Sequence, residues 1–194
     1  MEQYSYEQGR ELIKDGDIIF VRNSPTLTSK IIRFFTNSPY SHVGIAFWAT
    51  IGGQQRLLVV EAQGGTKRRV VNMGFYSLLN VDVASSPRDW NEYAVDALES
   101  IGIQDYGWFE AGYVGLREVL LHYFNWALSS RDLPGEICSE FVARLLQLPD
   151  PHISPQGLAR TLDEIGHPVK FQITPRNRKA LFRGLFMRNN NRLD

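Results

Sequence analysis

The sequence predicts an α+β fold in which a small antiparallel sheet packs against helices. The first half of the chain alternates short, β-branched apolar runs with glycine turns, which is typical of strands. After Pro87, longer segments carry apolar residues at helical spacing. A strand-rich region followed by a helix-rich region is typical of this class. The 194 residues are enough for one domain with a substantial core.

The strands of the first half are separated by recognisable turns and by one predicted helix. Gly52-Gly53 indicates a hairpin between the second and third strands, and Gly64-Gly65 indicates the next turn. Residues 27–36 have helical spacing and end before Pro39. The predicted strands are 18–22, 42–49, 56–62, 67–73 and 79–84.

The second half begins with an amphipathic helix predicted over 88–102 and closed by Gly102. Its apolar positions are Trp90, Ala94, Ala97, Leu98 and Ile101. The aromatic segment 110–128 favours another helix, which forms either part of the core or one wall of a substrate cleft. Ile137, Phe141, Leu145 and Leu148 share one helical stripe, with Val142 and Leu146 beside it. Ser154-Pro155 begins a short helix, and 168–173 is a last strand.

The composition excludes several classes of function. Lys+Arg and Asp+Glu are 21 each, so the net charge is zero, which argues against specific nucleic-acid binding. One cysteine excludes an internal disulfide and a multi-cysteine metal site. No metal or other cofactor is expected. The start of the chain lacks the pattern of a secretory signal, and no apolar run is long enough to span a membrane. We therefore expect cytoplasmic synthesis, with association with a virus particle left open.

The last residues, 174–194, differ from the rest of the chain. They carry six basic residues against a single acid, Asp194, and apolar residues are interleaved with them. We expect a domain over 1–173 and a basic amphipathic tail over 174–194. The tail either docks on an acidic partner, an assembly or an anionic membrane surface, or is a plain surface terminus.

Cys138 is predicted to lie in the first turn of a helix. There the helix dipole and free backbone N–H groups favour the thiolate, and the same N–H groups can hold an oxyanion. The alternative is an inert core cysteine, since free cysteines are among the most buried residues.

A thiol nucleophile needs a base and a group that orients the base. His42 opens a strand at the rim of the sheet, where it can meet a helix end. Glu61 ends the apolar run of the next strand, and hairpin pairing returns it to the same rim. Each also has a plainer interpretation, as an edge histidine and as a solvated charge at a strand end.

Four segments, in this order, resemble the circularly permuted branch of the NlpC-type papain-like superfamily. They are GDIIF, SHVGIAF, LLVVEA and GEICSEFV, and the similarity spans roughly Asp15 to Leu158. The subgroup that they resemble most is the YiiX-like proteins, with lecithin–retinol acyltransferase-like proteins more distant. IGIQDYGW resembles the helix-end tyrosine motif of the family, although Gly107 stands where the family tends to have aspartate.

The resemblance implies Cys138 as nucleophile, His42 as general base and Glu61 as the orienting group. It implies a permuted papain-like fold and a thiol hydrolase, a cysteine peptidase or amidase that takes a peptide or acyl substrate in a cleft. Peptidoglycan peptides are the leading substrate. An acyltransferase or esterase on lipid or conjugate substrates, and a low-turnover binding module, are the alternatives. The second oxyanion donor is left open between the Tyr40 and Tyr106 hydroxyls and a backbone group.

Overall fold

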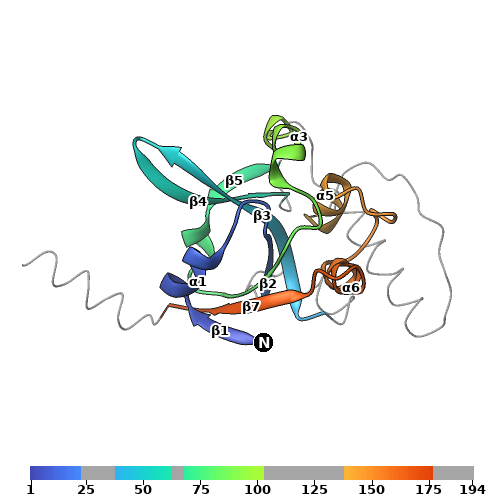
Figure 1. Cartoon of the computed structure of the whole chain (residues 1–194), viewed down its shortest axis with the longest axis horizontal. Helices are drawn as coiled ribbons and strands as arrows, with labels where there is room; N and C mark the ends of the chain where they lie inside the picture. The colour runs from blue at the N-terminus through green and yellow to red at the C-terminus, as the bar shows by residue number, and fades with distance from the viewer. Residues whose placement is uncertain (23–37, 63–67, 103–137, 177–194) are drawn as a thin grey trace, which may run out of the picture.

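The structure, a computed structural model, describes residues 1–22, 38–62, 68–102 and 138–176 (Figure 1). The described residues form a seven-stranded sheet in the order β1-β7-β6-β2-β3-β4-β5, in which β1 and β7 pair in parallel and the other neighbours pair antiparallel. The mixed α+β class predicted from the sequence is confirmed. The strands are β1 (Glu2–Ser5), β2 (Ile18–Arg22), β3 (Tyr40–Ile51), β4 (Gln54–Glu61), β5 (Arg69–Asn72), β6 (Asn80–Ala84) and β7 (Val169–Thr174).

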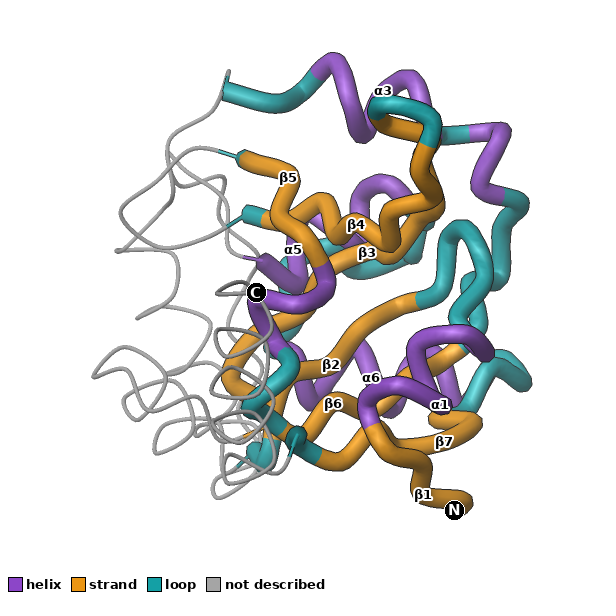
Figure 2. The backbone as a smooth tube through the Cα atoms, turned by 90° about the vertical axis from the view of Figure 1, so that its left-hand side faces the viewer, coloured by secondary structure: helices purple, strands orange, loops and turns teal. Residues whose placement is uncertain are grey.

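Short helices cover both faces of the sheet. Figures 1 and 2 show α5 and α6 on one side of the sheet and α1 on the other. The described helices are α1 (Tyr6–Leu12), η1 (Met73–Tyr76), η2 (Trp90–Glu92), α3 (Ala94–Glu99), α5 (Cys138–Leu145) and α6 (Pro155–Glu164).

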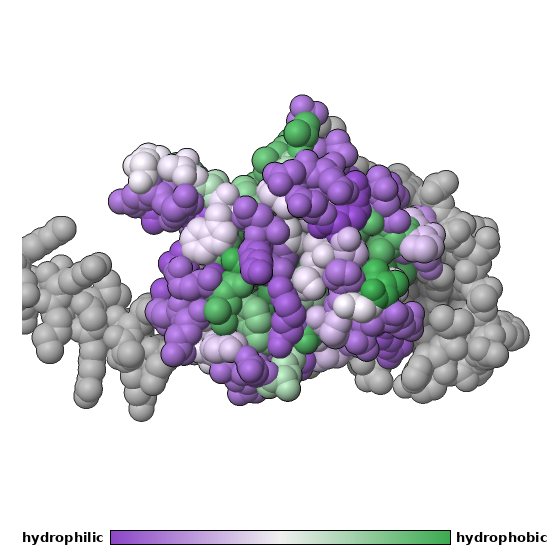
Figure 3. Space-filling model, in the orientation of Figure 1, coloured by the Kyte–Doolittle hydropathy of each residue, from purple (hydrophilic) through white to green (hydrophobic). Residues whose placement is uncertain are grey.

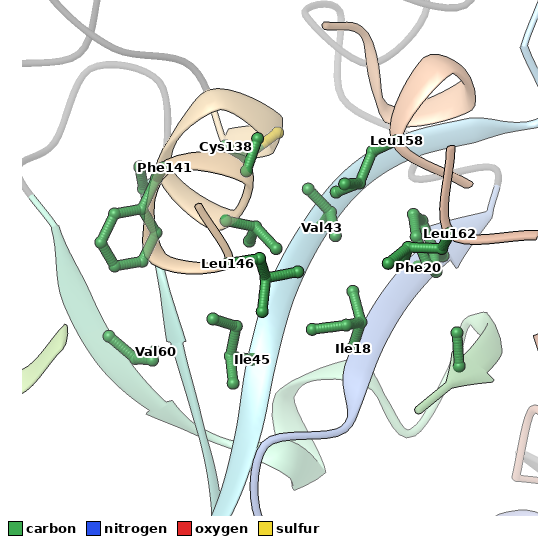
Figure 4. Close-up of a cluster of buried hydrophobic side chains, with 14 of the residues drawn as sticks. Ile18, Phe20, Val43, Ile45, Val60, Cys138, Phe141, Leu146, Leu158 and Leu162 are labelled. Atoms are coloured by element: carbon green, nitrogen blue, oxygen red, sulfur yellow. The ribbon is translucent and has the colours of Figure 1, made fainter. Parts of the chain in front are cut away.

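Strand alternation divides the core into two layers, because successive side chains of a strand point to opposite faces. Ile18, Val43 and Ile45 face α5 and α6 and pack on their apolar side chains (Figure 4). Ile19 and Ala46 face the other way, toward α1 and η1. Cys138, the first residue of α5, belongs to the same cluster of buried side chains as Ile18, Val43 and Ile45.

The β3–β4 hairpin explains how distant residues meet at one end of the sheet. Gly52 and Gly53 both have positive φ, 59° and 74°, which the two-residue hairpin turn requires. Antiparallel pairing then runs back to Ile45 opposite Val60. The end of β4 consequently lies beside the beginning of β3.

Most predicted elements are present, with different lengths. All five strands predicted in the first half and the last strand are found, and the Ser154 side chain caps α6 as expected. β1 and α1 have no counterpart among the elements predicted from the sequence. The predicted helix 27–36, the aromatic segment 110–128 and the Gly64-Gly65 turn lie outside the described residues.

The predicted helix over 88–102 is wrong in length and in its buried stripe. Two short helices, η2 and α3, replace it, and Leu98 and Ile101 are 38% and 39% exposed. Ala97 is buried as the stripe predicts, and Tyr93, which lies outside the stripe, is buried as well, while other apolar side chains of α3 reach the surface (Figure 3). The cysteine helix also ends earlier than its stripe predicts, at Leu145, and Gln147 follows with a φ of 55°.

The tail predicted from residue 174 begins inside the sheet. Thr174 is the last residue of β7, and Arg176 forms an ion pair with Glu7, with 2.7 Å between Nε and Oε1. Residues 177–194 lie outside the described residues. Within the described part of the chain, every helix is too short or too polar to cross a membrane.

Candidate active site

His42 and Glu61 meet at the end of the β3–β4 hairpin, as the sequence predicts. His42 is the third residue of β3, and Glu61 is the last residue of β4. The His42 Nε2 and Glu61 Oε2 atoms are 2.8 Å apart. The Glu61 side chain is fully buried, whereas 15% of the His42 side chain is exposed.

Two further residues hold the Glu61 carboxylate. Arg69 lies opposite Glu61 in the β4–β5 pairing, and its Nε donates to Oε1 over 2.9 Å. The Tyr76 hydroxyl donates to Oε2, the oxygen that also faces His42. Burial alone would raise the pKa of Glu61, but the charge of His42 and hydrogen bonds from His42, Tyr76 and Arg69 lower it to about 2. Glu61 is therefore a carboxylate near neutral pH.

Sequence reasoning missed Arg69 and Tyr76. A signal for Arg69 existed, because a turn predicted at Gly64-Gly65 places a residue near 69 opposite Glu61, and the structure pairs Arg69 with Glu61. Tyr76 has no such signal, since it follows β5 in the short 3-10 helix η1. Its burial raises its pKa, and the Glu61 charge raises it further, so the hydroxyl stays protonated and donates.

Gly44 leaves the space that Glu61 needs. Gly44 has no side chain at a position that shares a sheet face with His42, two residues away. A Cβ atom at this position would lie 2.6 Å from the Val59 Cγ1 atom and 3.4 Å from the Glu61 Cβ atom. A side chain here would therefore push on the strand that carries the carboxylate.

Cys138 is the first residue of α5 and contacts His42. Burial lowers the pKa of His42, but the charges of Glu61 and Cys138, together with hydrogen bonds to both, raise it to about 10. Because Nε2 faces Glu61, the ring nitrogen left for the cysteine is Nδ1. Figure 4 shows the sulfur and the Phe141 ring on opposite sides of the first turns of α5.

The first turn of α5 is fixed to the segment that precedes α6. The Ser139 hydroxyl donates to the Ile153 carbonyl over 2.5 Å. The Glu140 Oε1 and His152 Nδ1 atoms are 2.6 Å apart, and both side chains are buried. These contacts hold the position of the helix end that carries Cys138. The Cys138 side chain itself is 1% exposed.

Of the two tyrosines predicted as possible oxyanion donors, Tyr40 donates its hydroxyl proton to another group. The Tyr40 hydroxyl donates to the Asp82 Oδ2 atom over 2.8 Å, and Arg22 and Gln172 donate to the same buried carboxylate. Burial raises the pKa of Tyr40, and the bond to Asp82 raises it further. The single hydroxyl proton is thus used by Asp82. Tyr106 lies outside the described residues.

No three His, Cys, Asp or Glu side chains gather closely enough to hold a metal ion within the ranges that the structure describes. The His42 imidazole contacts both the Glu61 carboxylate and the Cys138 thiol, an arrangement through which a proton can pass between sulfur and imidazole.

The chain resembles a solved structure, whereas comparisons of its sequence find no match. No protein-family model matches the sequence, and no curated protein matches it significantly. Among solved structures, the chain is similar to the crystal structure of metalloprotein yiiX from Escherichia coli O157:H7. That similarity has a TM-score of 0.46 and 18% sequence identity, and it covers 87% of this chain and 91% of that chain.

Proposed function

We propose that this chain is a cysteine hydrolase of the permuted papain-like type, with Cys138 as nucleophile, His42 as general acid and base, and Glu61 as the orienting carboxylate. The observation that carries the proposal is the coupling of His42 to both partners. Both partners raise the pKa of this mostly buried imidazole, which favours an imidazolium cation that can stabilise an adjacent thiolate. The ordered sequence motifs support the same roles.

The proposed reaction has two steps. The Cys138 sulfur attacks the substrate carbonyl carbon, and a C–S bond forms while the oxygen becomes an oxyanion. Backbone N–H groups at the start of α5 stabilise that oxyanion. His42 gives its proton to the leaving amine as the C–N bond breaks. His42 then takes a proton from water, which attacks the acyl-enzyme and regenerates the thiolate and the imidazolium.

Glu61 contributes orientation and charge. Its carboxylate accepts a hydrogen bond from the Nε2–H group of His42, so Nδ1 stays directed at the sulfur. Arg69 and Tyr76 fix the carboxylate in turn, and neither contacts the reacting atoms in this scheme. The bond that we expect to be cleaved is an amide, with cell-wall peptidoglycan peptides as the first substrate class to test.

One observation favours a second function, a binding module with low turnover. Cys138 is 1% exposed and lies in the apolar cluster. Catalysis requires substrate to reach the sulfur, so a site that stays closed would bind partners without turning them over.

Covalent trapping separates the two functions. The folded protein is incubated with peptidoglycan fragments, peptide esters and lipid esters, and intact-mass spectrometry locates any adduct. The hydrolase proposal predicts an acyl adduct on Cys138 that His42→Asn abolishes. His167→Asn, which changes a histidine whose neighbour is Ser85, is the matched control and should keep the adduct. No adduct with any substrate class would favour the binding module.

A further inference from the structure

A small cavity lies on the side of α5 away from the Cys138 sulfur. Its volume is about 190 Å³. Pockets that hold drug-sized ligands measure about 300–1,000 Å³, so this cavity suits a much smaller ligand. It is lined by Arg68, Arg88, Asp96, Phe141, Arg144, Leu145 and Gln147.

Three guanidinium groups and one carboxylate give the lining a formal charge of +2. A guanidinium has five N–H donors in a planar fork, so one partner leaves further donors for a ligand. The fork geometry matches carboxylate and phosphate oxygens. When the Glu92 carboxylate that pairs with Arg88 is included, the charge is +1, which still favours an anion.

Two of the arginines are held in place before any ligand arrives. Arg88 donates from Nη1 to the Leu145 carbonyl over 2.7 Å and from Nε to Glu92 over 3.1 Å. The first bond covers a carbonyl at the C-terminal end of α5, whose partial negative charge would otherwise oppose an anion. The Arg68 guanidinium lies over the Phe141 ring, 4.8 Å from its centroid.

We propose that this arginine pocket binds a small oxyanion, a phosphate or the phosphoryl group of a larger molecule. The pocket is separate from the candidate active site. Arg144 follows Cys138 by six residues, about 9 Å along a helix, and Figure 4 shows Phe141 directed away from the sulfur. The inference does not depend on the hydrolase proposal, because it rests on other side chains.

The test is titration calorimetry of the whole chain with inorganic phosphate at constant ionic strength, with chloride as the reference anion. Arg144→Gln changes an exposed residue, so we expect a folded protein. It should weaken phosphate binding by about tenfold or more, the value of a charge-assisted hydrogen bond. Asp96→Asn should have the opposite effect and tighten binding, because it removes the one carboxylate of the lining. Arg56→Gln, which changes an exposed arginine of β4, is the matched control and should leave binding unchanged.

Vesicles that contain phosphatidic acid form a second arm. If the vesicles displace free phosphate from the pocket, the phosphoryl group belongs to a lipid headgroup. If free phosphate binds and the vesicles do not displace it, the ligand is a soluble phosphate. Heat no greater than with chloride would overturn the proposal. Equal phosphate affinity in the wild type, Arg144→Gln and Asp96→Asn would also overturn it.

Discussion

Replacing Glu61 with glutamine tests how the site controls the charge of His42. The substitution keeps the shape of the side chain and removes its negative charge. The pKa of His42 is about 10, against an ordinary value of 6.5. At about 1.4 kcal/mol for each pKa unit, this difference favours the imidazolium by about 5 kcal/mol.

Glu61 is the largest of the causes that raise the pKa of His42, and burial opposes it. In Glu61→Gln the burial, which lowers the pKa of His42, remains and the charge that raises it is gone, so we expect this pKa to fall well below 10. Loss of one partner from a buried ion pair typically costs about 3–5 kcal/mol of stability. We therefore expect a loss of that order in the free energy of unfolding at pH 6.

The assay is an NMR titration of the imidazole protons, with His42 assigned from the signal missing in His42→Gln. Urea unfolding measures stability in the same buffer. Glu92→Gln, which removes an exposed carboxylate paired with Arg88, is the matched control and should leave both quantities unchanged. A His42 pKa that stays near 10 in Glu61→Gln would refute the electrostatic reasoning.

Three further predictions concern the stability of the site. His42 has its pKa raised above the unfolded value, so its stabilising contribution is complete below pH 6.5 and is lost as pH rises through about 10. Glu61 has its pKa lowered from 4.5 to about 2, so its contribution is present above pH 4.5 and is lost as pH falls through about 2. Urea unfolding between pH 2 and 10 should show that these two groups add most to the free energy of unfolding between about pH 4.5 and 6.5. A wild-type dependence of this free energy on pH that is identical to that of Glu61→Gln would contradict the prediction. Gly44→Ala should cost about 1–3 kcal/mol through overpacking against Val59, measured by thermal unfolding; equal stability to the wild type would show that the strands yield freely. Tyr76→Phe should cost about 1–3 kcal/mol, because it takes a donor from the buried Glu61 carboxylate, and an unchanged urea midpoint would argue against that hydrogen bond.

The contact between His42 and Glu61 was predictable because hairpin geometry depends on local signals. Gly52-Gly53 fixes the turn, and two apolar strands of similar length then bring the end of one beside the start of the other. Cys138 at a helix start was predictable for the same kind of reason, from apolar spacing after Pro134-Gly135.

The parts of the site that were missed depend on tertiary packing. Tyr76 reaches Glu61 from a 3-10 turn that has no periodic signal. Tyr40 was a candidate oxyanion donor, but Asp82, distant in sequence and fully buried, takes its proton. The stripe of 88–102 failed in part because two short helices replace one long helix, so that Tyr93 between them is buried and Leu98 is 38% exposed.

The central claim is that His42 maintains a reactive thiolate at Cys138, and alkylation with iodoacetamide tests it most directly. An ordinary thiol ionises near pH 8.5, so its alkylation rate rises about tenfold per pH unit below that value. We predict that the folded protein is alkylated at Cys138 at a rate nearly constant from pH 6 to 8, and that His42→Asn restores the steep rise. A steep rise in the wild type, or alkylation only after unfolding, would contradict the account.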